Sequence, residues 1–194
     1  MKTQKKLSTK NLVLSAILTA LVIILQLMGA FVRFGPFSIS LVLIPIVIGA
    51  ASCGKGIGAW LGLVFGIVVL ASGDAAAFLA INPLGTVLTV LLKGTACGFL
   101  AGLAYKALEK TNKTLGVVLA AIVCPLANTG IFLLGCLAFF MGTIAEWASA
   151  FGFGNNVAQY MIFVLVGANF LFELLTNIIL SPIIVRLLNI RKAN

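Results

Sequence analysis

Several polar side chains lie within long apolar stretches of the sequence. Their polarity cannot be explained by exposure at a protein surface. Lys93 is the clearest case, because apolar residues 90–92 precede it and small residues 94–97 follow it. A charged group at the centre of a membrane helix costs about 2.5 to 3.5 kcal/mol on insertion scales. We therefore expect the Lys93 ammonium group to face the interior of a helix bundle and to meet an anion or a cluster of carbonyl groups.

Three further polar residues are predicted to lie near Lys93. Asn128 and Asn169 interrupt two other apolar stretches, and Glu173 follows Asn169 by one helical turn. If the three segments cross the membrane in alternating directions, Lys93, Asn128 and Asn169 reach a similar depth. Glu173 then lies slightly deeper, so the four side chains form one polar constellation in the outer half of the bundle.

This constellation has two interpretations. Lys93 and Glu173 could form a buried ion pair, with the amides joining neighbouring helices. Alternatively, the residues form a small-molecule site that opens outward, in which Lys93 binds an anionic group. Gln159 and Tyr160 are expected above the site, near its outer mouth. Arg33 is predicted to lie outside, either as a second positive contact above the site or as an interfacial anchor.

The sequence offers little for catalysis. It contains no histidine and four acidic residues, of which Glu173 alone lies deep in an apolar stretch. A serine–histidine–aspartate set is therefore excluded, and no acidic cluster could hold magnesium. The four cysteines have no metal-binding or redox spacing and are expected to be small core residues. We predict no catalytic residue, no metal site and no cofactor in this chain, and we favour binding or transport.

Membrane helices must position these residues. Hydrophobic residues make up 62% of the chain and charged residues 9%, whereas about a quarter of a soluble domain is charged. Lipid-exposed backbone must satisfy its own hydrogen bonds, which favours α-helices. We predict an all-α membrane protein in which residues 1–194 form a single compact bundle of six transmembrane helices. The predicted spans are 11–30, 38–52, 57–71, 83–108, 114–140 and 158–188. The second and third are short and are expected to be tilted or shielded by protein.

The basic residues predict the orientation. With a cytoplasmic N-terminus, eleven lysines and arginines fall inside, Arg33 falls outside and Lys93 lies within the membrane. An even number of spans then places both termini in the cytoplasm. The net charge of +9 does not indicate nucleic acid binding, because the basic residues flank apolar runs instead of forming a solvated face. The basic start resembles a secretory signal, but its apolar stretch is too long and lacks a cleavage site. We expect a retained first helix.

Two outer segments are long enough to act as lids over a site. Residues 72–82 hold Asp74, and residues 141–157 hold Glu146 and Trp147. Segments of this length in a compact domain are often binding loops, although they can also be plain solvated loops.

The third predicted helix presents a smooth face of small residues. Gly58, Gly62 and Gly66 follow one another at intervals of four residues. Such a face lets helix backbones approach closely, and we expect it to serve internal packing.

An ordered set of short motifs covers nearly the whole chain. The first helix contains Ala16 and Ala20 four residues apart, so both lie on one face. The segments FGPFSIS, LVLIPIVIGA, GKGIGAWLG and NPLGTVLTVLLKGTACGFLAGLAYKAL follow in that order. In this arrangement the chain resembles the substrate-binding S component of an energy-coupling factor (ECF) vitamin transporter.

The resemblance implies a function. An S component has no ATPase activity and binds a vitamin near the outer face of a prokaryotic plasma membrane, through helices four to six and loops. It docks through its first helix on a membrane coupling subunit that two ATPase subunits drive with ATP, and it is thought to topple to release its substrate. Carried over to this multi-pass chain, Ala16 and Ala20 form the docking surface. Lys93, Asn128 and Asn169 lie where the vitamin binds.

The identity of the vitamin remains open in the sequence. One buried lysine suits a ligand with a single carboxylate, and the chain resembles the pantothenate-type members most. Hydroxymethylpyrimidine or pyridoxine, riboflavin and folate are alternatives. A stand-alone small carrier or channel would need no ATPase partner. A membrane enzyme would need a catalytic cluster, and an assembly factor would not need Lys93.

Overall fold

The computed structural model of the protein is helical through most of its length. It describes residues 9–31, 33–34, 37–38 and 41–193, and it describes side chains for residues 9–29 and 41–189. Every apolar segment predicted to be a membrane span contains a helix. The prediction of a helical fold is therefore confirmed.

The predicted spans correspond closely to the observed helices. Five of these helices are α1 (Thr9–Phe31), α2 (Leu43–Cys53), α3 (Lys55–Ala71), α5 (Pro83–Leu108) and α6 (Lys113–Phe139). The sixth predicted span is a continuous run of three elements, namely α8 (Val157–Gln159), the π-helix η1 (Tyr160–Gly167) and α9 (Ala168–Ala193).

Among the residues that the structure describes, four helical stretches are long and apolar enough to cross a membrane. They are Thr9–Gly29, Pro83–Leu108, Lys113–Phe139 and Val157–Asn189. Helices α2 and α3 are shorter, with 11 and 17 residues. About 20 residues are needed for a straight crossing, so these two helices are short for that role, as their sequences predicted.

The connections between the spans contain structure that the sequence analysis did not predict. The second span was expected from residue 38, but α2 begins at Leu43. Arg33–Phe34 (β1) and Phe37–Ser38 (β2) pair instead as a small antiparallel hairpin. The segment predicted as the first lid contains α4 (Ala76–Ile81), and the second contains α7 (Met141–Ala150).

Asparagine side chains fix the starts of α5 and α6. Asn82 precedes α5, and its side-chain oxygen accepts a hydrogen bond from the Gly85 amide at 2.9 Å. Asn112 caps α6 in the same way, with the Leu115 amide at 3.1 Å. Each cap satisfies an amide that the helix itself leaves unpaired. These caps fix where α5 and α6 begin, and thereby the positions of the polar residues that the two helices carry.

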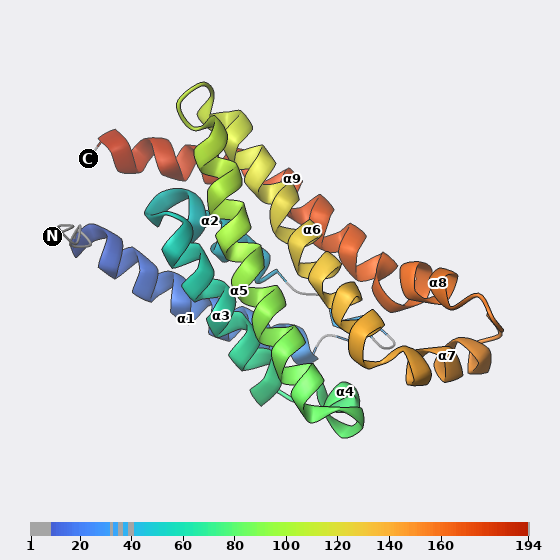
Figure 1. Ribbon diagram of the computed structural model, residues 1–194. Helices are drawn as coiled ribbons and strands as arrows, with labels where there is room; N and C mark the ends of the chain where they lie inside the picture. The colour runs from blue at the N-terminus through green and yellow to red at the C-terminus, as the bar shows by residue number, and fades with distance from the viewer. Residues whose placement is uncertain (1–8, 32, 35–36, 39–40, 194) are drawn as a thin grey trace, which may run out of the picture.

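The bundle has two chemically different ends. The start of α1, the α2–α3 turn, the α5–α6 connection and the end of α9 lie together at one end (Figure 1). These segments carry lysines and arginines, and we call this the basic end. Helices α4, α7 and α8 lie at the other end, which we call the α4–α7 end (Figure 1). The charge asymmetry deduced from the sequence is thus an asymmetry along the bundle.

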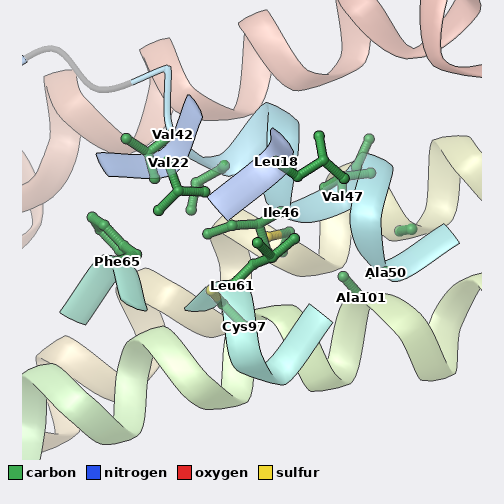
Figure 2. Close-up of a cluster of buried hydrophobic side chains, with 14 of the residues drawn as sticks. Leu18, Val22, Val42, Ile46, Val47, Ala50, Leu61, Phe65, Cys97 and Ala101 are labelled. Carbon is green, nitrogen blue, oxygen red and sulfur yellow. The ribbon is translucent and has the colours of Figure 1, made fainter. Parts of the chain in front are cut away.

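A buried apolar cluster joins the first half of the chain to α5. Leu18 and Val22 of α1 pack with Ile46 of α2, Leu61 of α3 and Cys97 of α5, and Figure 2 shows these side chains converging. A second cluster joins the end of α6 to α7 and η1, through Cys136, Phe140, Ile144, Ala148, Tyr160 and Met161. The space between these two clusters is where polar residues from several helices can meet.

Helices α3 and α5 approach each other along the glycines that the sequence singled out. A Cβ atom on Gly62 would overlap the carbonyl oxygen of Gly94, and one on Gly98 would overlap that of Gly58. The contact is thus made by small residues on both helices, with Gly94 and Gly98 of α5 as partners that the sequence analysis did not identify. Close backbone contact of this kind is a common way for membrane helices to associate.

This contact predicts a specific sensitivity to side-chain size. Gly62→Ala should destabilise the protein by about 1 to 3 kcal/mol, because the added methyl group forces the two backbones apart. Gly56→Ala is the matched control, since a Cβ atom there meets nothing within 4 Å. The melting temperature of detergent-purified protein checks the prediction. An equal effect of both substitutions on the melting temperature would contradict the close contact.

Candidate functional site

A cavity of about 490 Å³ opens between the two apolar clusters, toward the α4–α7 end of the bundle. Residues of α1, α3, α5, α6, η1 and α9 form its walls. The α3–α4 turn, α4 and α7 also contribute residues. Its volume falls in the range of small-molecule pockets, about 300 to 1,000 Å³.

Lys93 lines this cavity from α5 and is half-buried. Its Nζ atom lies 5.5 Å from the ring centroid of Phe65 and 5.3 Å from that of Phe132. The ammonium group is therefore held between ring faces of α3 and α6 by cation–π interactions. Lys93 and Glu173 line the same cavity, but the two side chains do not approach closely enough to form a salt bridge.

Glu173 is buried on α9 with 2% of its surface exposed, and two amides bind it. The Nδ2 group of Asn128 donates to Oε2 at 3.4 Å, and that of Asn169 donates to Oε1 at 3.3 Å. Asn128 belongs to α6, whereas Asn169 precedes Glu173 by one turn of α9. The carboxylate thereby connects α6 to α9 and holds both amides in one orientation.

These amides leave hydrogen-bonding capacity at the cavity. The Oδ1 atoms of Asn128 and Asn169 and the Oγ1 atom of Thr89 are buried without a hydrogen-bond partner. All three residues line the cavity. A buried polar atom without a partner costs about 1 to 3 kcal/mol. A ligand that offers hydrogen-bond donors would recover part of that cost.

A second polar pair lies at the α4–α7 end of the cavity. Gln26 of α1 is 1% exposed, and its Nε2 group donates to Asp74 Oδ2 at 3.1 Å. Asp74 lies in the turn between α3 and α4, and both residues line the cavity. The sequence analysis placed Asp74 in a lid but did not name Gln26. The available signal was a single amide in the apolar second half of the first span.

Aromatic rings cover the same end of the cavity. Phe78 of α4 makes edge-on contacts with Phe132, Phe140 and Trp147, at centroid distances of 5.6, 5.0 and 5.6 Å. These contacts join α4 to α6 and α7. Both predicted lid segments therefore contribute residues that cover the cavity, and α4 is attached to its neighbours by ring packing.

The structure brings most of the predicted site residues together. Lys93, Asn128, Asn169, Glu173 and Tyr160 all line the cavity.

Gln159 and Arg33 do not join that group. The Gln159 side chain is exposed and is absent from the cavity wall, because it points away from its buried neighbour Tyr160. Arg33 belongs to strand β1, and its side chain lies outside the described residues.

The predicted docking residues do not line the cavity. Ala16 and Ala20 are exposed on α1, whereas Ser15, Leu18 and Val22 of the same helix are buried. The two alanines therefore belong to an outward face of α1 and make no part of the cavity.

The geometry suits binding of a small polar molecule. Among the described residues, the cavity wall contains one cation, two carboxylates, unpaired acceptor atoms and aromatic rings. Within the part of the chain that the structure describes, no three histidine, cysteine, aspartate or glutamate residues gather as a metal site would require.

Comparison with known proteins gives a consistent picture. Residues 10–188 match the family model described as "ECF transporter, substrate-specific component". The chain is also similar to the pantothenic acid transporter PanT of Lactococcus lactis subsp. cremoris strain MG1363. The two are 27% identical over 198 aligned positions, which cover 93% of this chain and 94% of the relative. No solved structure matches the chain.

The surroundings of Lys93 predict that its charge does not stabilise the ligand-free protein. Ring faces contribute about 0.5 to 2 kcal/mol, and the Glu173 carboxylate adds a longer-range attraction. Together these contributions do no more than offset the cost of about 2.5 to 3.5 kcal/mol for a charge within the membrane. Lys93→Met should therefore leave the melting temperature unchanged or raise it, as thermal unfolding in detergent would show. Lys106→Met is the control, because Lys106 is exposed on the same helix. A loss of about 3 to 5 kcal/mol, typical of a broken buried ion pair, would contradict this account.

Proposed function

Because the chain belongs to the family of substrate-specific components of ECF transporters, we propose that it captures a small vitamin in the cavity around Lys93 and delivers it to an ATP-driven module. The family consists of transporter components, and the chain is a multi-pass plasma-membrane protein. The observation that carries the proposal is a cavity of about 490 Å³ that contains an ammonium group held by ring faces, with no salt bridge to it among the described residues.

The proposed substrate is pantothenate. This molecule has one carboxylate at one end and two hydroxyl groups at the other, joined through an amide. Its carboxylate complements Lys93, and its hydroxyl groups complement the unpaired acceptors of Asn128 and Asn169. The similarity to a pantothenic acid transporter across nearly the whole length of both chains supports the same choice.

The proposed orientation follows from the charge asymmetry of the bundle. Basic residues concentrate near the membrane surface that faces the cytoplasm. We therefore assign the basic end to the cytoplasm, so that both termini lie there and the cavity opens outward. In this arrangement α2 and α3 complete a bundle of six membrane helices, and residues 1–194 act as one substrate-binding domain.

The proposed partners are a membrane coupling subunit and two ATPase subunits. Ala16 and Ala20 form a narrow exposed strip on α1, where a partner helix could approach closely. Docking at this strip leaves the polar wall of the cavity free. Capture of the vitamin and attachment to the ATP-driven module are therefore separable functions in this chain.

Binding of pantothenate by the purified protein tests the substrate directly. Lys93→Met should weaken binding by about 1 to 3 kcal/mol, or roughly 5- to 150-fold, because a charge-assisted contact is lost. Isothermal titration calorimetry measures the change, with Lys106→Met expected to bind like the wild type. Unaltered affinity in Lys93→Met would remove the assignment of Lys93 to the carboxylate.

If another vitamin is the substrate, the same titration identifies it. Hydroxymethylpyrimidine or pyridoxine, riboflavin and folate should then bind where pantothenate does not. The aromatic residues of the cavity wall are the feature that favours a ring-shaped ligand over pantothenate. A stand-alone carrier differs in another way, since it would transport its substrate without the ATPase subunits.

The docking strip gives an independent prediction. Combining Ala16→Leu with Ala20→Leu should abolish uptake of labelled vitamin into cells and leave binding to the purified protein intact, because the added bulk separates the partner helix. Ala107→Leu combined with Ala138→Leu is the matched control, since both alanines are exposed on other helices. Equal uptake by the two double variants would show that the strip is not the docking surface.

A further inference from the structure

The direction of the two cavity amides is fixed by Glu173. Each amide uses its N–H group on one carboxylate oxygen, Asn128 at 3.4 Å and Asn169 at 3.3 Å. Each Nδ2 group commits one of its two N–H bonds to Glu173, and this fixes the orientation in which each amide presents its oxygen, an acceptor without a partner. Glu173 therefore acts as a positioning residue for the hydrogen-bonding character of this part of the wall.

The acceptors so produced are unsatisfied in the protein itself. Asn128 is 4% exposed, and its Oδ1 atom has no hydrogen-bond partner, nor has that of Asn169. Native proteins leave few buried polar atoms unpaired, and two on adjacent helices at one cavity suggest that a ligand completes them. The group that completes an acceptor must be a donor, such as a hydroxyl group.

Lys93 favours an anionic group instead of a hydrogen-bond donor, and its ammonium group lies at a different depth along the bundle. Its Nζ atom lies beside the ring of Phe132, which follows Asn128 by one turn of α6. Helix α6 runs from the basic end toward α7, so Phe132 is one turn closer to the α4–α7 end than Asn128. Asn128 and Asn169 both donate to Glu173, so their acceptors lie together near the level of Asn128. We therefore take the Lys93 cation beside Phe132 to lie nearer the α4–α7 end than both acceptors.

We propose that the cavity recognises both ends of its substrate. Asn128 and Asn169 bind the hydroxyl-bearing end innermost, and Lys93 binds the carboxylate nearer the α4–α7 end. This inference rests on the proposed function and adds the direction in which the substrate lies. It makes Asn128 and Asn169 residues that determine specificity for hydroxyl groups, and Lys93 the residue that determines specificity for the carboxylate.

Two analogues of pantothenate separate the two ends. Panthenol carries an alcohol in place of the carboxylate, and a second analogue carries hydrogen in place of both hydroxyl groups. The wild type should bind each analogue at least about 10-fold more weakly than pantothenate, because each leaves a buried polar group unpaired. Affinities come from titration of the three ligands against purified wild type, Lys93→Met and Asn128→Leu.

The two variants should fail in different ways. Lys93→Met should bind pantothenate and panthenol with nearly equal affinity and still reject the analogue without hydroxyl groups. Asn128→Leu should no longer distinguish pantothenate from the analogue without hydroxyl groups, but it should still prefer pantothenate to panthenol. Asn177→Leu is the matched control, because Asn177 is a buried amide of α9 whose Oδ1 atom is also unpaired but which does not line the cavity. It should discriminate like the wild type.

Each other outcome overturns a defined part of the account. Loss of carboxylate discrimination in Asn128→Leu, with loss of hydroxyl discrimination in Lys93→Met, would show the reverse orientation. An equal loss of affinity for all three ligands in both variants would show that neither residue recognises a particular end of the substrate. If the folded wild type binds no pantothenate, the proposed substrate fails, and the orientation of this substrate fails with it.

Discussion

An ammonium group between two ring faces, inside a largely apolar bundle, is the interaction on which the proposed binding site depends. Phe65 and Phe132 lie 5.5 and 5.3 Å from Lys93 Nζ and supply the partial negative charge of their faces. Such contacts are weaker than the cost of placing a charge within a membrane. The protein therefore retains a cation that its own side chains stabilise incompletely, and the deficit is what an anionic ligand can supply.

The rest of the fold holds that cation in place. The glycine contact sets the distance between α3, which carries Phe65, and α5, which carries Lys93. Helix α6 supplies Phe132 on the other side, and Glu173 connects α6 to α9 through Asn128. The glycine contact between α3 and α5 thus helps to position the polar side chains of the cavity.

The sequence predicted the parts of this arrangement that depend on composition. Long apolar runs identified the helices. Lys93, Asn128 and Glu173 were identified because each places a polar side chain inside such a run, and burial of polar groups in a membrane is costly. The parts that depend on tertiary geometry were less accessible. Helices α4 and α7 are short and lie within connections, so no long apolar run marked them. Gln26 could be recognised as a residue of the cavity wall only from the structure, in which the α3–α4 turn places Asp74 beside it. Gln159 does not line the cavity beside Tyr160, because adjacent helical residues point in different directions.

The central claim is that the cavity around Lys93 holds a small anionic nutrient. The most direct test is mass spectrometry of the small molecules released by denaturing freshly purified protein, compared between the wild type and Lys93→Met. The account predicts that the wild type releases a molecule that carries a carboxylate and hydroxyl groups, and that the variant releases far less of it. Equal amounts from both proteins, or a released molecule without a carboxylate, would contradict the claim.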